Sequence, residues 1–519
     1  MINLSLLEGL YLFNNHGLKK VLTATFAASI LFTTADVTPV KAEEKQEIKN
    51  IIFLIGDGMG PSYVTAHRYM KDNPETQEME LTGFDPYLVG MQSVYSADPY
   101  YDGDEDDEKE NIPDSAATAT SMSSGVKTYN GAIAVDMEHV DTKTVLEVAK
   151  EKGKSTGLVV TSQVNHATPA AYGAHELTRQ NYNEIADDYY DDLINGEHKI
   201  DVILGGGTDY FIREDRNITE EFQADGFNYV TTTDELLANT NKQVLGLFAP
   251  VGLEKAIDRP AEQPSLQQMT AHALEMLSKN EEGFFLMIEG SQIDWAGHDN
   301  DVVASMSEME DFEQAFNEAI EFAKKDKHTL VVATADHSTG GFSIGANGPY
   351  TWDVDVIKAA KHTPDYLARK IVEDNADVKQ TLAENITFDL TEEEITSVQE
   401  ALDNAAEDAK VTEVDNAIER IFDERSGTGW TTDGHTGEDV PVYAYGPGSE
   451  LFAGLIDNTD NAVNIFNILE SDGKVQKNGA ELAETASAYP AKVLTGLVIV
   501  SLGGLFFIRK RKPSESRTL

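Results

Sequence analysis

Near its start the chain reads Ile51-Ile52-Phe53-Leu54-Ile55-Gly56-Asp57-Gly58-Met59-Gly60. The unbroken apolar run from Ile51 to Ile55 is typical of a strand buried on both faces, and the glycines that follow it mark its end. Asp57 therefore stands at the carboxyl end of the predicted strand, where a sheet of this kind places its functional groups.

The same pattern recurs along the 519 residues of the chain. Further apolar runs that end in polar residues or glycines lie at 157–160, 202–204, 284–288 and 330–333. Helical patterns separate these runs at 142–152, 265–279 and 303–325. The alternation predicts an α/β fold, a three-layer sandwich with a mostly parallel central sheet and helices on both faces.

Composition narrows the possible functions. Hydrophobic residues make up 41% of the chain, which is enough for a large core, while 90 Asp and Glu against 40 Lys and Arg give a net charge of -50. Such a charge argues strongly against nucleic acid as a partner, and it repels an anionic substrate unless cations are bound in the site. The chain has no cysteine, so disulfides and thiolate metal sites are excluded.

The pattern along the chain predicts five segments. Residues 1–42 read as a secretory signal peptide, and residues 43–456 as the main domain. Within it, residues 363–424 read as an inserted helical cap without chemistry of its own. Residues 457–488 are expected to be a tether, and residues 489–512 a C-terminal transmembrane or sorting segment with a basic tail.

The two ends carry the targeting signals. Val21–Phe32 is a short apolar run before the small-residue cleavage site Val40-Lys41-Ala42. Val493–Ile508 is apolar and the basic run Arg509–Lys512 follows it, which fits a membrane anchor with a positive-inside tail. Leu482–Ala486 resembles a variant sortase signal, but loosely. We therefore expect an extracellular protein held at the cell surface, in the membrane or, less favoured, in the cell wall.

Two further local patterns predict a helix start and a loop. Thr391 and Glu394 form a capping box inside the predicted helical cap. The acidic run at 102–108 has enough carboxylates to bind calcium, but it lacks the spacing of a known calcium loop. We interpret it as a solvated acidic loop.

Ser115 has two interpretations. It lies in Pro113-Asp114-Ser115-Ala116-Ala117, ahead of a small-residue pattern that runs to Gly125. Asp114 or Ser115 could cap a helix in the ordinary way. Alternatively, Ser115 is a nucleophile at a helix N-terminus, where unpaired N–H groups favour a bound phosphate.

Candidate metal ligands lie in several separate motifs, and all of them offer an oxygen or a nitrogen atom. Asp294 and His298 are four residues apart, one helical turn, while Asp336 and His337 follow a predicted strand. His435 lies between glycines in a loop. Each pattern is weak alone, because surface helices and loops often carry such residues. Together with Asp57 and Glu289 they form an oxygen and nitrogen ligand set that suits zinc and magnesium.

A family resemblance follows from the order of these motifs. The chain resembles bacterial alkaline phosphatases over roughly residues 48–446, and no single motif would be specific enough. The matching motifs are Asp57-Gly58-Met59-Gly60, Asp114-Ser115-Ala116, His166-Ala167-Thr168-Pro169-Ala170-Ala171, Glu289-Gly290 with Asp294 and His298, Thr334-Ala335-Asp336-His337, and His435-Thr436-Gly437.

The resemblance implies three metal ions and a phosphate clamp. One Zn2+ would be held by Asp294, His298 and His435. A second Zn2+ would be held by Asp57, Asp336, His337 and the nucleophile Ser115. A third ion, usually Mg2+, would use Asp57, Thr168 and Glu289. Arg179 would clamp two phosphate oxygens, oriented by Asp114, although by itself it reads as a surface cation. His166 and Trp295 stand where some members have an aspartate and a lysine near the third metal and the phosphate.

The resemblance also implies the reaction. Phosphate monoesters of many alcohols would be hydrolysed through a phosphoserine on Ser115, with release of inorganic phosphate, and family members are often dimers. A phosphodiesterase or sulfatase of the same superfamily is the alternative enzyme, and Arg179 favours the monoesterase over it. A surface phosphate-binding protein without turnover is the alternative outside enzymes. The intact nucleophile and metal ligands argue against this last reading.

Overall fold

The structure is a computed structural model that describes residues 47–97, 111–346, 348 and 350–473. The predicted signal peptide, the acidic run at 102–108 and the predicted segment at 489–512 lie outside the described residues. In the part of the chain that is described, no helix has both the length and the apolar character needed to cross a membrane.

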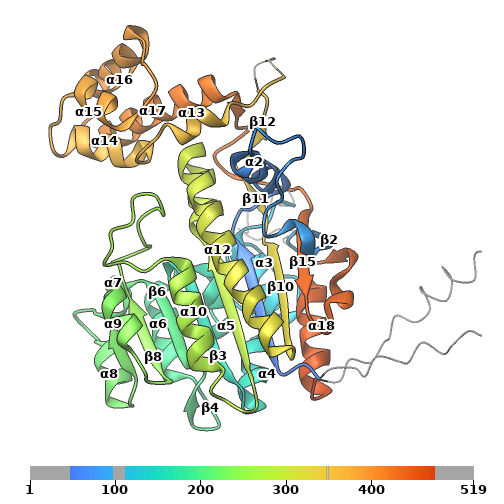
Figure 1. The fold of residues 1–519 in the computed structure, drawn as a ribbon. Coiled ribbons are helices and arrows are strands. Elements are labelled where there is room, and N and C mark those ends of the chain that lie inside the picture. Colours follow the sequence, from blue (N-terminus) through green and yellow to red (C-terminus); the bar gives the residue numbers. More distant parts are fainter. Residues whose placement is uncertain (1–46, 98–110, 347, 349, 474–519) are drawn as a thin grey trace, which may run out of the picture. The chain divides into compact units, whose positions relative to one another are not determined.

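A sheet of ten strands forms the centre of the fold, in the order β16-β2-β15-β10-β1-β9-β3-β6-β8-β7 (Figure 1). Only β15 runs antiparallel to its neighbours, so the predicted mostly parallel α/β sheet is confirmed. The strands are β1 (Asn50–Gly56), β2 (Leu88–Ser93), β3 (Ser155–Gln163), β6 (Val202–Gly206), β7 (Asn228–Val230), β8 (Val244–Leu247), β9 (Phe284–Gly290), β10 (Thr329–Ala335), β15 (Val440–Tyr445) and β16 (Gly454–Asp457).

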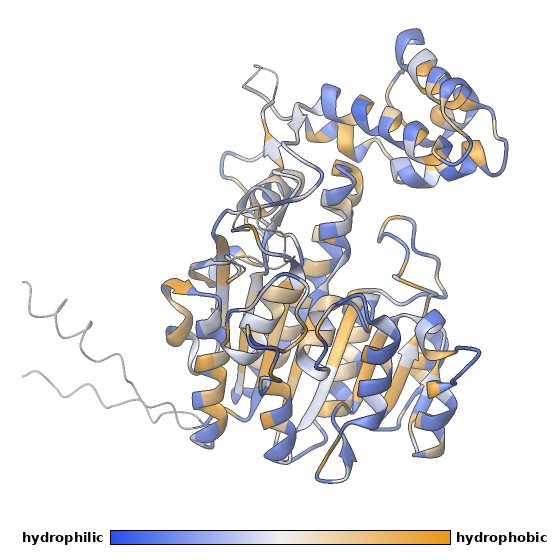
Figure 2. Cartoon of the chain, turned by 180° about the vertical axis from the view of Figure 1, so that it is seen from behind, coloured by the Kyte–Doolittle hydropathy of each residue, from blue (hydrophilic) through white to orange (hydrophobic). Residues whose placement is uncertain are grey.

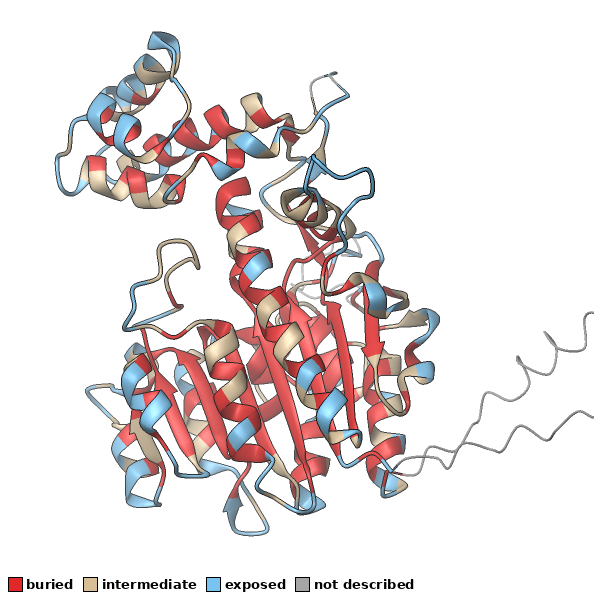
Figure 3. Cartoon of the chain, in the orientation of Figure 1, coloured by how far each residue is buried: buried red, intermediate tan, exposed pale blue. Residues whose placement is uncertain are grey.

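The two faces of the sheet bury two separate apolar cores. Along β1, Ile52 and Leu54 belong to one core, whereas Ile51, Phe53 and Ile55 belong to the other. Successive side chains of a strand point to opposite faces, so a strand covered on both sides must be apolar throughout. The inner strands, such as β1, β9 and β10, are accordingly buried along their lengths (Figure 3) and mostly hydrophobic (Figure 2).

Helices cover both faces and complete the predicted three layers. One core packs against α2 (Pro61–Lys71), α9 (Thr233–Ala238), α10 (Leu266–Leu277) and α12 (Val302–Asp326). The other packs against α3 (Ser115–Ser124), α4 (Val145–Glu151), α5 (Ala167–Gly173), α6 (Tyr182–Asp191), α7 (Thr208–Phe211), α8 (Ile218–Ala224) and α18 (Thr459–Glu470).

Shorter elements connect these layers. They are α11 (Gln292–His298), the 3-10 turns η4 (Asp85–Tyr87) and η5 (Ser449–Phe452), and the two-residue strands β4 (Leu193–Ile194), β5 (Glu197–His198), β11 (Ser338–Thr339), β12 (Ser343–Ile344), β13 (Thr428–Gly429) and β14 (His435–Thr436). The pairing of β11 with β14 brings the segment around His435 to the end of β10.

The helical insertion consists of α13 (Val354–Lys358), α14 (Pro364–Val372), α15 (Val378–Asn385), α16 (Glu392–Asn404) and α17 (Lys410–Ser426) (Figure 1). It begins one helix before the expected boundary at 363. The capping box of Thr391 and Glu394 is present at the start of α16, as predicted. Leu367, Ile418 and Phe422 are fully buried and join the same core as α12.

One domain boundary was wrong. We expected a tether from residue 457, but β16 adds the last strand to the sheet and α18 packs on α3 and α4. Ala462, Ile465 and Ile468 are buried on the inner side of α18. These apolar residues recur every three residues and form a helical face, so the domain extends to the end of α18.

Candidate active site

The predicted site residues meet outside the carboxyl ends of the central strands. β1 pairs in parallel with both β9 and β10, and Gly56 is in register with Ala335 and Gly290. Asp57, Glu289 and Asp336 therefore reach the same edge of the sheet. The other expected residues come from α3, α5, α11, β14 and the segment before α6. The structure places every one of them in this region.

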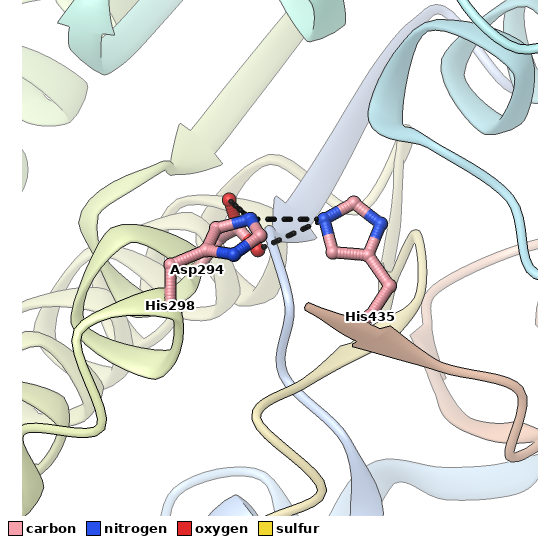
Figure 4. A group of neighbouring side chains, drawn as sticks. All are labelled: Asp294, His298 and His435. Carbon is pink, nitrogen blue, oxygen red and sulfur yellow. Dashed lines mark hydrogen bonds and ion pairs between the residues drawn. The ribbon is translucent and has the colours of Figure 1, made fainter. Parts of the chain in front are cut away.

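The first ligand set consists of Asp294, His298 and His435 (Figure 4). Asp294 and His298 lie one turn apart on α11, and the His298 Nε2 atom is 3.4 Å from Asp294 Oδ2. His435 Nε2 lies 3.6 Å from Asp294 Oδ1 and 3.1 Å from His298 Nε2. Three ligand atoms thus face one point.

Backbone carbonyls fix both imidazole rings of this set. His298 Nδ1 lies 2.6 Å from the Asp433 carbonyl oxygen, and His435 Nδ1 lies 2.7 Å from that of Pro113. Each Nδ1 therefore carries the hydrogen, which leaves both Nε2 lone pairs toward Asp294. This is the arrangement of histidines that bind a metal, so the residues fit the zinc site implied by the sequence.

Asp57, Asp336, His337 and Ser115 form the second set. All four are buried, and His337 Nε2 lies 3.1 Å from Asp336 Oδ2, 3.5 Å from Asp57 Oδ1 and 3.2 Å from Ser115 Oγ. Both carboxylate oxygens of Asp57, and Oδ2 of Asp336, have no hydrogen-bond donor among the described residues. Burial raises the pKa of Asp57 well above its ordinary value, and the charge of Asp336 raises it further. A cation at this point would offset the cost of burying the Asp57 carboxylate and its repulsion by Asp336.

The third set is larger than the sequence predicted. Asp57, Glu289 and His166 each present a ligand atom to a common point, with Thr168 beside them on α5. Glu289 Oε1, Thr168 Oγ1 and His166 Nδ1 are buried without a hydrogen-bond partner in the described structure. Burial raises the pKa of Glu289 to about 7. The oxygens suit Mg2+, and His166 adds a nitrogen to the expected set.

The two interpretations of Ser115 prove compatible. Asp114 is the N-cap of α3, and its Oδ1 accepts a hydrogen bond from the Ala117 N–H at 2.9 Å. Ser115 is the first helical residue, so its hydroxyl is not used as a cap and faces His337. Ser115 thus stands at the helix terminus, where first-turn N–H groups favour a bound anion.

Arg179 lies beside the serine. Its Nη1 donates to Asp114 Oδ2 at 3.0 Å, and its Nη2 donates to His166 Nε2 at 3.1 Å. Burial and the arginine charge lower the pKa of His166 to about 3, so the imidazole is neutral and accepts this hydrogen bond. The Trp295 ring meets the His166 ring edge-on, with centroids 5.7 Å apart. The expected orientation of Arg179 by Asp114 is therefore present.

Thr339 is a site residue that the sequence analysis missed. Its hydroxyl donates to Asp294 Oδ1 and lies 3.3 Å from His337 Nδ1, so it joins the first and second sets. Tyr63 Oη donates to the Thr339 carbonyl oxygen at 2.8 Å and fixes the segment. The signal available was the position of Thr339, two residues after the Asp336-His337 pair and before two glycines.

Comparison with known proteins identifies the family of the chain. The family model described as "Alkaline phosphatase" matches residues 48–471. The chain is 57% identical over 468 residues to "Alkaline phosphatase 3" of Bacillus subtilis (strain 168), covering 88% of this chain and 98% of that protein. It is 32% identical over 454 residues to the "Repressible alkaline phosphatase" of Saccharomyces cerevisiae, covering 79% of this chain and 78% of that protein.

Solved structures show the same fold. The cold-active alkaline phosphatase of Shewanella sp. superposes with a TM-score of 0.73 at 42% identity, over 81% of this chain and 99% of that one. A variant of the alkaline phosphatase of the Antarctic bacterium TAB5, with a histidine replaced by glutamate, superposes with a TM-score of 0.58 at 28% identity, over 82% of this chain and 99% of that one. That variant is described with Mg bound in its M3 site.

Proposed function

The chain belongs to the alkaline phosphatase family and is a phosphoric monoester hydrolase, and on this premise we propose that Ser115 is its nucleophile. The proposed reaction is hydrolysis of small phosphate monoesters through a phosphoserine, with release of inorganic phosphate. The observation that carries the proposal is the position of the Ser115 hydroxyl at the start of α3, 3.2 Å from His337 Nε2 and beside unpartnered oxygens of Asp57 and Asp336.

We assign the metals of this metal-dependent family to the three ligand sets. Asp294, His298 and His435 would hold one Zn2+. Asp57, Asp336 and His337, with Ser115, would hold a second. The third set would take Mg2+ through Asp57, Glu289 and Thr168, with His166 at its edge. Bound metals would favour the ionised serine and neutralise charge on the phosphate. The Mg described for the TAB5 variant supports a magnesium site in a relative.

The residues of the chain then account for the steps. The Ser115 hydroxyl gives its proton to solvent water as Oγ attacks phosphorus, the bond from phosphorus to the ester oxygen breaks, and the leaving alkoxide takes a proton from water. A water molecule next attacks the phosphorus of the phosphoserine, the bond from phosphorus to Oγ breaks, and Oγ takes the proton that this water loses, which restores the hydroxyl. Arg179 and the N–H groups at the start of α3 hold the negative oxygens throughout both steps.

Arg179 also separates this function from its alternatives. A phosphate monoester dianion has three free oxygens that share two negative charges, and a forked guanidinium can hold two of these oxygens, whereas a diester has only two free oxygens and one charge. Asp114 Oδ2 accepts from Nη1, and Asp114 directly precedes Ser115 in the chain, so the guanidinium is bonded to the residue next to the proposed nucleophile. We therefore favour the monoesterase over a phosphodiesterase or sulfatase. The complete nucleophile and ligand sets argue against a binding protein without turnover.

Location and assembly rest on the sequence alone. We propose an extracellular enzyme, led out by residues 1–42 and held at the cell surface through residues 489–512, in the membrane or the cell wall. Removal of residues 489–519 is expected to move phosphatase activity from the cell fraction to the medium, and activity that stays with the cells would contradict the anchor. A homodimer remains a prediction, which sedimentation of the purified chain would test.

Kinetics and metal content of the purified chain test the proposal. We expect hydrolysis of p-nitrophenyl phosphate at alkaline pH, its loss in EDTA and its return with Zn2+ and Mg2+. Ser115→Ala should lower kcat by on the order of 10³-fold or more, because the covalent route is removed. Ser121→Ala is the matched control, since Ser121 lies on the same helix and its hydroxyl donates, among the described residues, to the Ala117 carbonyl oxygen of that helix alone.

Three results would contradict it. Full activity of Ser115→Ala would exclude the nucleophile. Faster hydrolysis of bis-p-nitrophenyl phosphate than of the monoester would favour the diesterase. Metal analysis that finds fewer than two zinc ions in the active chain would overturn the assigned ligand sets.

A further inference from the structure

A second group of carboxylates lies away from the proposed catalytic sets, where the helical insertion meets the main domain. Asp415 and Glu419 lie one turn apart on α17, and Asp299 is the residue that ends α11. One oxygen from each of the three lies within 4.8 Å of the others. Figure 1 shows α17 close to the beginning of α12, which α11 precedes, and the two helices are in contact.

Two of these carboxylates are buried without a partner. Asp415 is 4% exposed and Glu419 is 5% exposed. Among the described residues, Asp415 Oδ1 and Glu419 Oε1 have no hydrogen-bond donor, and neither side chain forms an ion pair. Buried charges are ordinarily paired, because an isolated one costs several kcal/mol or more.

Two buried acids on α12, outside the catalytic ligand sets, follow that rule. Glu313 is 2% exposed and accepts hydrogen bonds from Lys71 Nζ at 2.7 Å and from the Gly83 N–H at 2.8 Å. Glu308 is 1% exposed and accepts from the Ala256 N–H at 2.6 Å. Among the described residues, the pair on α17 therefore differs from these two acids in having neither a hydrogen-bond donor nor an ion-pair partner.

The surroundings add negative charge. Asp301 is 2% exposed and is the N-cap of α12. Its Oδ1 accepts hydrogen bonds from the Val303 and Ala304 N–H groups. Lys255 is a nearby cation, and its charge partly offsets the rise that burial causes in the pKa of Asp301 and Asp415. Its Nζ donates to the Gln292 carbonyl oxygen at 3.4 Å. Burial, and then repulsion within the group, raises the pKa of both Asp415 and Glu419.

We propose that Asp299, Asp415 and Glu419 bind one divalent cation of the calcium and magnesium class, with calcium the better fit. The donors are carboxylate oxygens without imidazole or thiolate, which is the set these hard cations prefer. Two oxygens on opposite sides of one Ca2+ stand about 4.8 Å apart, since each lies about 2.4 Å from the ion. Asp299 is exposed, so water can complete the coordination shell from that side.

The proposed cation would give the helical insertion a structural task. It would join α17 to the residue that follows His298 on α11, the helix that carries two of the proposed zinc ligands. Like charges four residues apart on a helix repel each other. A bound ion would cancel the repulsion between Asp415 and Glu419 and so stabilise α17.

Cation uptake by the whole chain tests the proposal. The chain is first saturated with Zn2+ and Mg2+, and bound calcium is measured by equilibrium dialysis with labelled Ca2+. Bound magnesium is measured in parallel. The test variant is Asp415→Asn with Glu419→Gln. The control is Glu413→Gln with Glu424→Gln, which removes the same charge from exposed positions of the same helix.

We expect the wild type and the control to hold one more calcium ion per chain than the test variant. A difference of one magnesium ion instead would keep the site and identify its ion. Equal content of both ions in all three proteins would overturn the site.

Thermal unfolding distinguishes the loss of a cation site from poor folding of the variant. In resin-treated buffer without calcium, the test variant should unfold at the wild-type temperature or above it, because repulsion is removed. Added Ca2+ should raise the Tm of the wild type and leave that of the variant unchanged, and Glu419→Gln alone should show a smaller response. An equal rise in all proteins would show binding elsewhere and would contradict the proposal.

Discussion

Asp114 shows how much one residue does in this site. Its Oδ1 accepts from the Ala117 N–H and caps α3, while its Oδ2 accepts from Arg179 Nη1 and from the Gly131 N–H, both at 3.0 Å. The carboxylate therefore fixes the helix that begins with Ser115 and also the arginine that would bind the phosphate. The nucleophile and the clamp share one support, so they keep their relative position.

Two substitutions separate these tasks. Asp114→Asn keeps an oxygen for the cap but turns an N–H toward Arg179, so we expect KM for p-nitrophenyl phosphate to rise about tenfold with Tm nearly unchanged. Asp114→Ala also loses the cap and should cost about 1 kcal/mol of stability in addition. Steady-state kinetics and thermal unfolding measure the two effects. Equal losses of Tm in both variants would show that the two tasks are not separable.

Residue types in the sequence predicted the catalytic and ligand side chains better than they predicted the groups that hold those side chains in place. The catalytic and ligand candidates are acids, histidines, a serine and an arginine in recognisable motifs, and the strand ends bring them together. The carbonyl oxygens of Pro113 and Asp433 orient two of the histidines, but any residue type can supply a carbonyl. Asp415 and Glu419 read as part of an acidic helical surface, because only the tertiary packing of α17 buries them.

At the scale of elements, the position of α11 depends on a close approach. Gly297 lies between Asp294 and His298 in sequence, and a Cβ atom there would meet Tyr63 Oη and lie 3.0 Å from Thr339 Cβ. Both neighbours are held by the hydrogen bond from Tyr63 to the Thr339 carbonyl oxygen. The helix that carries two proposed zinc ligands therefore fits against this segment only with glycine.

Gly297→Ala tests this dependence. We expect α11 to shift and the zinc affinity of the first ligand set to fall by about 10- to 100-fold, as when the support of a metal ligand is lost. Zinc content after dialysis against zinc buffers is the measurement.

Gly434→Ala is the control, since it adjoins His435 but a Cβ atom there lies 3.6 Å from Thr432 Oγ1, an ordinary contact. Unchanged zinc affinity in Gly297→Ala would show that the contact does not set the position of the helix.

The elements themselves could be predicted where burial is complete. β1, β9 and β10 are apolar runs, and they lie within two residues of their expected bounds. The strands at one edge of the sheet could not be predicted, because β2 and β16 are short and partly exposed. They also pair with strands that are distant in sequence. The apolar face of α18 was present in the sequence, at Ala462, Ile465 and Ile468, but residues 457–488 were still interpreted as a tether.

At the scale of the whole molecule, the net charge of -50 opposes folding. Repulsion among exposed carboxylates acts over about 30 Å at 0.01 M salt but over only about 8 Å at 0.15 M. Salt also weakens favourable surface ion pairs, yet each of these contributes only about 0–1 kcal/mol. With acids more than twice as numerous as bases, the reduction of repulsion should outweigh the loss of pairs.

We therefore expect the Tm of the metal-loaded protein to rise when NaCl increases from about 0.01 to about 0.15 M. Calcium is kept at 1 mM in every sample, so that occupation of the proposed site on α17 does not contribute to the change. Tetramethylammonium chloride at the same ionic strength is the control, because screening depends on ionic strength and not on the identity of the cation. A rise with NaCl alone would indicate specific sodium binding, and a fall with both salts would show that surface ion pairs outweigh the repulsion.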